Sequence, residues 1–306
     1  MRGAVTQFLM DDMRIPSISI IGLGALGSVL AEALVSRGAV LFSIFSRDRA
    51  TVQRITASLE VTEAGPFPGT AKELGELVFL TVPDSAITEV AERLIALPGS
   101  LAGKTFVHCS GNESAGILQP LGAKGGRTAS MHPMQTFTPQ SVPADFEDIY
   151  FSLQGHPGAM PVLRHIAGLL GGDALEINEE QKAHMHAAAV MASNYLVTLL
   201  DASTEAGSLG GLDKEKVQKV LLPLIQTTLR NIQSASFDES ISGPVVRGDI
   251  ETVKSHLKLL GRKPELRELY AVLGMETVNR AEGAGLLEDI STKQLRQLLS
   301  AILNHE

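Results

Sequence analysis

Residues 17–39, SISIIGLGALGSVLAEALVSRGA, place three glycines between an apolar run and a segment with helical periodicity. The run before the turn has no polar side chains other than serine, as expected for a strand buried on both faces of a sheet. After the turn, Val29, Leu30, Ala33 and Leu34 recur at the spacing of one helix face. A strand, a glycine turn and a helix in direct succession favour an α/β fold.

The glycines of GLGALG have the spacing of a dinucleotide-binding turn. Gly22 permits the tight turn, Gly24 lets the backbone approach a pyrophosphate, and Gly27 lets the helix pack closely on the strand. The free N–H groups at the start of the helix would bind the phosphates. The predicted cradle consists of Gly22, Leu23, Gly24, Ala25, Leu26 and Gly27. The alternative is a close strand-to-helix turn that binds no ligand.

The second predicted strand, in VLFSIFSRDRA, ends at Ser46 and Arg47 rather than at an acidic residue. An acidic residue at this tip would bind the ribose of NAD. Serine and arginine would instead bind the 2′-phosphate of NADP through charge-assisted contacts. We therefore predict NADP, with NAD less favoured. Two alternatives remain: Ser46 or Asp48 caps the next helix while Arg47 is solvated, or Asp48, slightly late for the ribose, still allows NAD.

Short β-rich runs alternate with helical patterns up to about residue 178, and the sequence beyond is almost entirely helical. Alternation of this kind predicts parallel βαβ units with right-handed crossovers. A length of 306 residues fits two domains of ordinary size. We predict an α/β Rossmann domain with a doubly wound, mostly parallel sheet over residues 1–178, followed by an all-α domain over residues 179–306.

The composition narrows the class of protein. No apolar run approaches the roughly 20 residues that a membrane span needs, and the first 14 residues, MRGAVTQFLMDDMR, do not resemble a signal peptide. The single cysteine, Cys109, fits a reducing compartment. A net charge of -8 argues against a general nucleic-acid binder. We expect a cytoplasmic protein that acts on a small molecule, with neither nucleic acid nor a membrane as partner.

Polar residues follow two of the predicted strands, at the edge that lines the ligand crevice of such sheets. Thr81, Val82 and Pro83 end one strand and would pack against the ribose and nicotinamide; a plain strand–loop–helix junction is the alternative. VHCSGNES ends the next strand. From it we assign Ser110 and Gly111 to the cofactor site, and Ser110 to the substrate site as well.

The long helical pattern EEQKAHMHAAAVMASNY carries polar residues among small apolar ones. Lys182 and His186 are four residues apart and share a face; Ser193 continues that stripe and Asn194 lies beside it. Polar groups on such a helix need partners or a cavity. We predict Lys182, His186 and Asn194 as catalytic and Ser193 as substrate-binding. The histidines lack the spacing of metal ligands, so no metal is predicted.

Two further residues are candidates for the substrate site. His132, in SMHPMQTF, either contacts the substrate or is held by backbone groups in a proline-bounded loop. Arg247, in GPVVRGD, would hold a substrate carboxylate with its planar guanidinium group. The alternative for Arg247 is an ion pair with a neighbouring acid. Asp249 is expected to cap the helix that follows.

Six motifs together resemble an uncharacterised bacterial family that joins a Rossmann-like NADP-binding domain to an all-helical C-terminal domain of unknown function. They are, in chain order, GLGALG, LTVPDSAI, HCSG, SMHPMQTF, KAHMHAAAVMASNY and GPVVRGD. More distantly, the layout is similar to pyrroline-5-carboxylate reductase, ketopantoate reductase, prephenate dehydrogenase and the 6-phosphogluconate dehydrogenase superfamily. In that superfamily the substrate lies between the domains, and the helical domains commonly build a dimer. The resemblance thus implies a homodimer formed through the helical domain.

The resemblance also bears on the long helix. Several members of the superfamily use a lysine and an asparagine on their first long helix, and Lys182, with His186 and Asn194, gives the nearest match here. The interval from Lys182 to Asn194 is longer here than in the usual pair.

Taken together, the sequence predicts an NADP-dependent oxidoreductase, a dehydrogenase or reductase. It would transfer a hydride between nicotinamide and a carbonyl or imine carbon of a small, carboxylated substrate. His186 or Lys182 would move the proton, Asn194 and Ser110 would orient the substrate oxygen, and Arg247 would hold the carboxylate. The alternative is a non-catalytic NADP-binding protein that senses redox state or docks to a partner.

Overall fold

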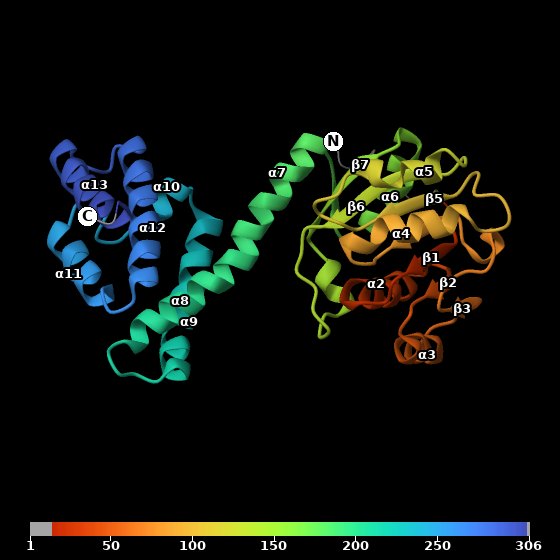
Figure 1. The fold of residues 1–306 in the computed structure, drawn as a ribbon, viewed down its shortest axis with the longest axis horizontal. Helices are drawn as coiled ribbons and strands as arrows, with labels where there is room; N and C mark the ends of the chain where they lie inside the picture. Colours follow the sequence, from red (N-terminus) through yellow and green to blue (C-terminus); the bar gives the residue numbers. More distant parts are fainter. Residues whose placement is uncertain (1–13, 305–306) are drawn as a thin grey trace. The chain divides into compact units, whose positions relative to one another are not determined.

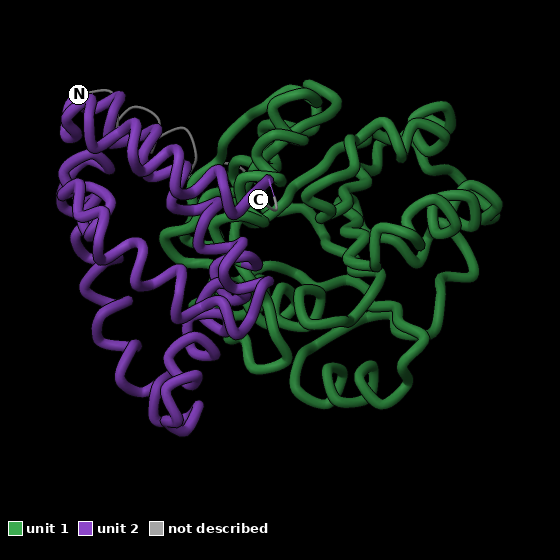
Figure 2. The backbone as a smooth tube through the Cα atoms, turned by 60° about the vertical axis from the view of Figure 1, so that its left-hand side comes forward, with its two compact units in different colours: residues 1–193 green, residues 194–306 purple. Residues whose placement is uncertain are grey.

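The computed structural model describes residues 14–304 and divides the chain into two compact units, Met1–Ser193 and Asn194–Glu306 (Figure 2). The first unit holds a sheet with helices on both faces, and the second is helical. Near residue 178 the sequence pattern changes from alternating strands and helices to helices alone, and a helix begins there in the structure. The Asn178 side chain caps this helix by accepting a hydrogen bond from the Gln181 N–H. The domain limits at residues 178 and 179 stay a prediction.

One sheet of eight strands forms the centre of the first unit (Figure 1). The strands are β1 (Ile18–Ile21), β2 (Leu41–Phe45), β3 (Glu63–Gly65), β4 (Leu77–Leu80), β5 (Thr105–His108), β6 (Arg127–Pro133), β7 (Tyr150–Gly155) and β8 (Asp173–Glu176). They are ordered β3-β2-β1-β4-β5-β6-β7-β8, and the pairing of β6 with β7 is the antiparallel one. The predicted α/β fold with a mostly parallel sheet is therefore confirmed.

Helices cover both faces of this sheet. They are α2 (Ala25–Ser36), α3 (Arg49–Ser58), α4 (Asp84–Ile95), α5 (Gln119–Gly122) and α6 (Met160–Leu169), with short 3₁₀ turns at 71–73, 115–118, 143–146 and 157–159. The last helix to begin in this unit, α7 (Glu179–Ala189), follows β8 and contributes no side chain to the apolar cores of the sheet. Apolar side chains of α2 and α6 pack on one face and those of α4 and α5 on the other. Successive strand residues alternate between these two cores, as the pleat of a strand requires: Phe79 joins the first and Val78 the second.

The register of the strands aligns the ends that carry the predicted site. Ile21 of β1 pairs with Leu80 of β4, Leu80 pairs with His108 of β5, and His108 pairs with Ser130 of β6. These four strands are parallel, so the loops that follow β1, β4 and β5 leave the sheet at one edge. At about 4.8 Å between neighbouring strands, β6 lies roughly 14 Å from β1 along this edge.

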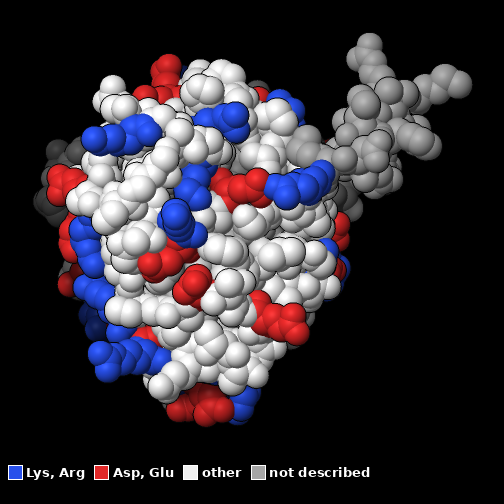
Figure 3. Space-filling view, turned by 90° about the vertical axis from the view of Figure 1, so that its right-hand side faces the viewer, with Lys and Arg blue, Asp and Glu red and all other residues white. Residues whose placement is uncertain are grey.

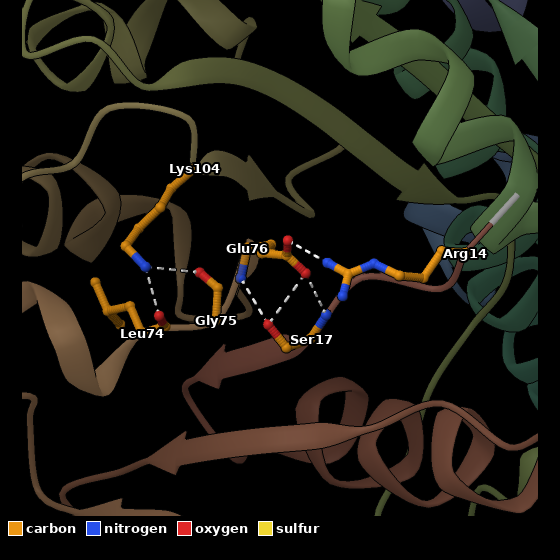
Figure 4. A network of polar contacts seen from close by, with 6 residues as sticks. All are labelled: Arg14, Ser17, Leu74, Gly75, Glu76 and Lys104. Carbon is orange, nitrogen blue, oxygen red and sulfur yellow. Dashed lines mark hydrogen bonds and ion pairs between the residues drawn. The ribbon is translucent and has the colours of Figure 1, made fainter.

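The opposite edge of the sheet is held by a polar network (Figure 4). Glu76 forms an ion pair with Arg14 and accepts a hydrogen bond from the Ser17 N–H at 3.1 Å. Lys104 donates to the carbonyl oxygens of Leu74 and Gly75. These contacts join the starts of β1, β4 and β5, away from the edge that carries the glycine turn, so we assign them to stability.

The second unit consists of helices, as predicted, and its described residues contain no strand. The helices are α8 (Tyr195–Ser208), α9 (Lys214–Ser234), α10 (Phe237–Ser240), α11 (Ile250–Leu260), α12 (Pro264–Gly283) and α13 (Asp289–Leu303). A five-residue π-helix, η5 (Val190–Asn194), joins α7 to α8. The last three helices share an apolar core that includes Val253, Val278 and Leu295. No helix among residues 14–304 is long and apolar enough to span a bilayer.

Candidate functional site: the carboxyl edge of the sheet

The glycine turn between β1 and α2 has two glycines that the fold itself requires. Gly22 has a φ of +104°, and a Cβ there would lie 2.8 Å from the Thr81 carbonyl oxygen. A Cβ on Gly27 would collide with the Gly22 carbonyl oxygen and lie 2.6 Å from Thr81 Oγ1. The close approach of helix to strand that the motif predicts is thus present. Thr81, directly after β4, also packs against both glycines.

Gly24 differs from the other two glycines, because a Cβ there would meet no protein atom within 4 Å. Its backbone is extended, with a φ of -72° and a ψ of -164°, and any residue can adopt this conformation. Gly24 precedes the first residue of α2, and no side chain caps the free N–H groups of that helix. Open space beside uncapped N–H groups at a helix start suits a phosphate, so the turn fits a dinucleotide.

A cavity of about 370 Å³ extends from this turn to the tip of β2. Eight of the predicted cofactor residues line it: Gly22, Leu23, Gly24, Ser46, Arg47, Thr81, Val82 and Pro83. The other predicted cradle residues, Ala25, Leu26 and Gly27, form the first turn of α2. Phe67 and Arg93 also line the cavity, with the Arg93 guanidinium carbon 3.7 Å from the centre of the Phe67 ring. The sequence gives no signal for this cation–π pair, because the two residues lie in unrelated segments.

The contacts at the tip of β2 show whether its polar residues cap the next helix or are free to bind a cofactor. Asp48 caps α3: its carboxylate accepts hydrogen bonds from the N–H groups of Ala50 and Thr51 and from the Thr51 hydroxyl. The Thr51 bonds lower the pKa of Asp48. Its carboxylate oxygens are therefore engaged in the cap. Arg47 is exposed, and its guanidinium makes no ion pair within residues 14–304. The capping alternative is correct for Asp48, and Arg47 remains available to an anionic ligand.

Lys182 of α7 is buried at the ends of β5 and β6, with 1% of its surface exposed. Its Nζ donates hydrogen bonds to the Ser110 carbonyl oxygen at 2.7 Å and to Ser130 Oγ at 2.8 Å. Burial lowers the pKa of Lys182 to about 8. The structure thus brings two predicted site residues, Lys182 and Ser110, into direct contact.

Ser110 also organises the loop after β5. Its hydroxyl donates to Asp84 Oδ2 at 2.7 Å and accepts hydrogen bonds from the N–H groups of Asn112 and Glu113. Asp84 begins α4, so this bond ties the ends of β4 and β5 together. The contacts of Asp84 with Ser110 and of Ser130 with Lys182 were not predicted from the sequence. The register of the strands determines these contacts, and no local sequence pattern reveals that register.

Two residues just before Ser110 in the sequence, His108 and Cys109, are placed for packing rather than for chemistry. His108 is fully buried, accepts a hydrogen bond from the Ser110 N–H on Nδ1 and faces the Ser114 carbonyl oxygen with Nε2. Burial and the nearby Lys182 charge lower the pKa of His108 to about 4, so the ring is neutral. Burial raises the pKa of the Cys109 thiol to about 12. Both residues therefore serve packing at this edge.

His132 and His186 meet over Gly111. The two rings are nearly perpendicular, with centroids 6.1 Å apart. A Cβ on Gly111 would collide with His186 Nδ1 and lie 2.9 Å from His132 Nε2. His132 Nδ1 lies 3.0 Å from the Cys109 carbonyl oxygen, while His186 Nδ1 is buried without a hydrogen-bond partner among the described residues. Three predicted site residues thus converge on one point, as Gly111 carries no side chain.

The remaining predicted residues lie at or beyond the π-helix. Ser193 Oγ is 3.0 Å from Thr136 Oγ1 in the loop after β6. Asn194 and Arg247 belong to the second unit, and both are exposed. Asp249 caps α11 as predicted, by accepting a hydrogen bond from the Thr252 N–H. The roles predicted for Ser193, Asn194 and Arg247 stay predictions.

On the face in Figure 3, lysine and arginine side chains are interspersed with aspartate and glutamate. Within the part of the chain that the structure describes, no group of three or more histidine, cysteine, aspartate or glutamate residues could hold a metal ion.

Comparison with family models divides the sequence into two parts. Residues 2–133 match a Rossmann-like domain, and residues 149–277 match the domain of unknown function DUF2520. The chain therefore combines a Rossmann-like domain with a DUF2520 domain, which confirms the predicted family layout. The second match begins before β7, so it includes the end of the sheet as well as helices. No curated protein sequence matches the chain significantly.

Solved structures with this fold include several of similar length. A candidate NADP oxidoreductase from Bacteroides fragilis is 24% identical, with a TM-score of 0.70 over 86% of this chain and 97% of that one. A protein from Thermotoga maritima is 28% identical, with a TM-score of 0.68 over 87% and 98%. The reductive aminase from Aspergillus terreus, in complex with NADPH and ethyl levulinate, is 17% identical, with a TM-score of 0.62 over 95% and 99%. The TM-scores of the first and third show a shared fold, and identities below 25% limit the likeness to the fold.

Proposed function

We propose that the protein is an NADP-dependent oxidoreductase acting on a carbonyl or imine carbon of a small, carboxylated substrate. The observation that carries this proposal is the cavity that runs from the uncapped start of α2 to Ser46 and Arg47 at the tip of β2. When bound, the cofactor would supply or accept the hydride at its nicotinamide ring. The names of similar structures, which include NADP or NADPH, support the choice of cofactor.

Each part of the cavity has a distinct task in this proposal. The N–H groups at the start of α2 would bind the pyrophosphate, and Arg47 would bind the 2′-phosphate through a charge-assisted contact. Asp48 is held in its cap by Ala50 and Thr51, so it would not compete for the ribose. Thr81, Val82 and Pro83 would pack along the nicotinamide half, toward Ser110 and Gly111.

The polar residues at the ends of β5 and β6 would handle the substrate. His186 or Lys182 would exchange a proton with it, and Ser110 and Asn194 would orient its oxygen or nitrogen. Arg247 would hold the carboxylate. If so, Arg247→Ala should raise KM for a carboxylated substrate and leave KM for its ester unchanged. An equal rise for both compounds would contradict this role.

Calorimetric titration tests the cofactor assignment directly. Wild-type protein should bind NADPH more tightly than NADH, and Arg47→Glu should remove most of that preference. Lys124→Glu is the matched control, because it changes the net charge equally at an exposed position outside the cavity. No heat with either nucleotide would refute the cofactor site. Binding without turnover, in a screen of 2-keto acids, imines and hydroxy acids, would instead favour a redox-sensing role.

We also propose a homodimer formed through the helical unit, in a cytoplasmic protein. Helix α9 has 21 residues, and Val217 is the buried one among them. Large apolar side chains on α8 and α9 are exposed, including Tyr195, Val220 and Leu224. Clusters of exposed apolar side chains commonly mark protein interfaces. A second copy of the chain would cover them, as the distant resemblance implies.

A further inference from the structure

We propose that His132 Nε2 and His186 Nδ1 together bind the reacting oxygen of the substrate, and that the substrate is therefore a ketone or its alcohol rather than an iminium. This inference rests on the proposed oxidoreductase function and adds two points to it. It assigns the proton transfer to His132 Nε2 in place of His186 or Lys182, and it narrows the class of substrate. All the residues involved belong to the first unit.

The hydrogen-bond partner of His132 fixes where its hydrogen lies. Its Nδ1 is 3.0 Å from the Cys109 carbonyl oxygen, which can only accept, so Nδ1 carries the hydrogen. In the neutral ring Nε2 is then an acceptor. Burial, Lys182 and His186 all lower the pKa of His132 against the opposing effects of Cys109 and Asp84, which favours the neutral ring at rest.

His186 supplies the second half of the arrangement. Its Nδ1 is buried and meets no partner among the described residues, which is costly for a polar group unless a ligand satisfies it. The hypothetical Cβ of Gly111 would collide with this atom and lie 2.9 Å from His132 Nε2. Both nitrogens therefore lie close to the position that a side chain of residue 111 would occupy, and glycine is what allows them to approach each other there.

A hydroxyl group matches this pair of nitrogens. Its oxygen can accept a hydrogen bond from His186 Nδ1–H and donate its own hydrogen to His132 Nε2. An iminium nitrogen has no lone pair with which to accept from His186. Lys182 reinforces this preference, because its positive charge acts on the pKa of His132 more strongly than the negative charge of Asp84 does. A neutral carbonyl compound suits this environment better than a cation.

The proton balance follows from this geometry. When the alcohol is oxidised, the O–H bond breaks and its proton moves to His132 Nε2. The electron pair of that bond forms the carbonyl π bond as the hydride leaves the carbon for the oxidised nicotinamide. In reduction the same proton returns from Nε2 to the oxygen. Throughout, His132 Nδ1 keeps its hydrogen and donates it to the Cys109 carbonyl oxygen, and this hydrogen bond holds the ring in place.

Histidine NMR tests the first half of the proposal without any substrate. In ¹⁵N-labelled protein with NADPH bound, His132 should show the tautomer with hydrogen on Nδ1. His132→Asn identifies its signals and keeps a donor near the Nδ1 position, so the fold should survive. Finding the hydrogen of His132 on Nε2 would overturn the proposal even if NADPH binds normally.

Kinetics test the second half. His132→Asn should lose at least about 100-fold in kcat for a ketone, the scale of general acid–base catalysis, with NADPH affinity unchanged. His184→Asn, at an exposed position two residues from His186, is the matched control and should keep full activity. Faster turnover of a cyclic imine than of its ketone analogue, or full activity in His132→Asn, would overturn the proposal. Loss of NADPH binding in the wild type would instead refute the proposed function itself.

Discussion

The buried ammonium group of Lys182 should make the stability of the protein depend on pH in a measurable way. Burial lowers the pKa of Lys182 from 10.5 to about 8 in the folded protein. A tenfold change in the acid dissociation constant corresponds to about 1.36 kcal/mol, so folding disfavours the charged form by about 3 kcal/mol. Between about pH 8 and pH 10.5 the unfolded chain binds more protons than the folded one. The free energy of unfolding should therefore rise with pH across this window.

Replacing Lys182 with methionine removes this titration, and the methionine side chain is similar to that of lysine in length and shape. The free energy of unfolding of wild type minus that of Lys182→Met should increase by about 3 kcal/mol from below pH 8 to above pH 10.5. Urea denaturation at a series of pH values measures this difference, and titrations elsewhere cancel. Lys124→Met, which removes an exposed lysine, is the control. A constant difference for Lys182→Met across the window would show that the folded protein does not suppress the charge, and the reasoning would fail.

Three further predictions follow from the same structure. Gly24→Ala should leave the melting temperature unchanged but weaken the binding of NADPH, because a Cβ at Gly24 meets no protein atom. Gly27→Ala should lower the melting temperature, because a Cβ there collides with protein atoms. Thermal denaturation and calorimetry measure the two effects, and equal melting temperatures for the two variants would contradict the prediction. Cys109 should resist a thiol reagent at neutral pH until the protein is unfolded, since burial raises its pKa to about 12; rapid labelling of the native protein would refute it. Aspartate at both Val220 and Leu224 should convert a dimer to a folded monomer by light scattering and circular dichroism, and an unchanged mass would place the interface elsewhere.

Local signals made much of the fold predictable. The first strand, glycine turn and helix were predictable because the residues that define them lie within 23 positions of sequence, 17–39. Seven of the eight strands carry an apolar or β-rich run that is visible in the sequence. The exception, β3, is three residues long and carries no apolar pattern, since its residues are EAG. The antiparallel direction of β7 is set by how the chain returns to the sheet, and the pattern within a strand does not encode it.

The site was predictable in its residue types but not in its contacts. Helical spacing placed Lys182 and His186 on one face, and the structure brings both to the ends of β5 and β6. Their partners depend on long-range register: Ser130 reaches Lys182 because it pairs with His108 across the sheet. The proximity of His132 to His186 depends on the missing side chain of Gly111. The motif around that glycine, VHCSGNES, assigns it to the cofactor site and does not reveal this second effect.

The first unit holds both the cavity proposed for the cofactor and the residues proposed to move the proton. Lys182 and His186 lie on α7, and both contact or approach residues of the loop after β5. Proton transfer through His132 and His186 would therefore need no group from the second unit. A carboxylate contact through Arg247 would need that unit, because Arg247 belongs to it. Under these two proposals, substitutions at His132 should act on the chemical step, while substitutions at Arg247 should act on substrate affinity.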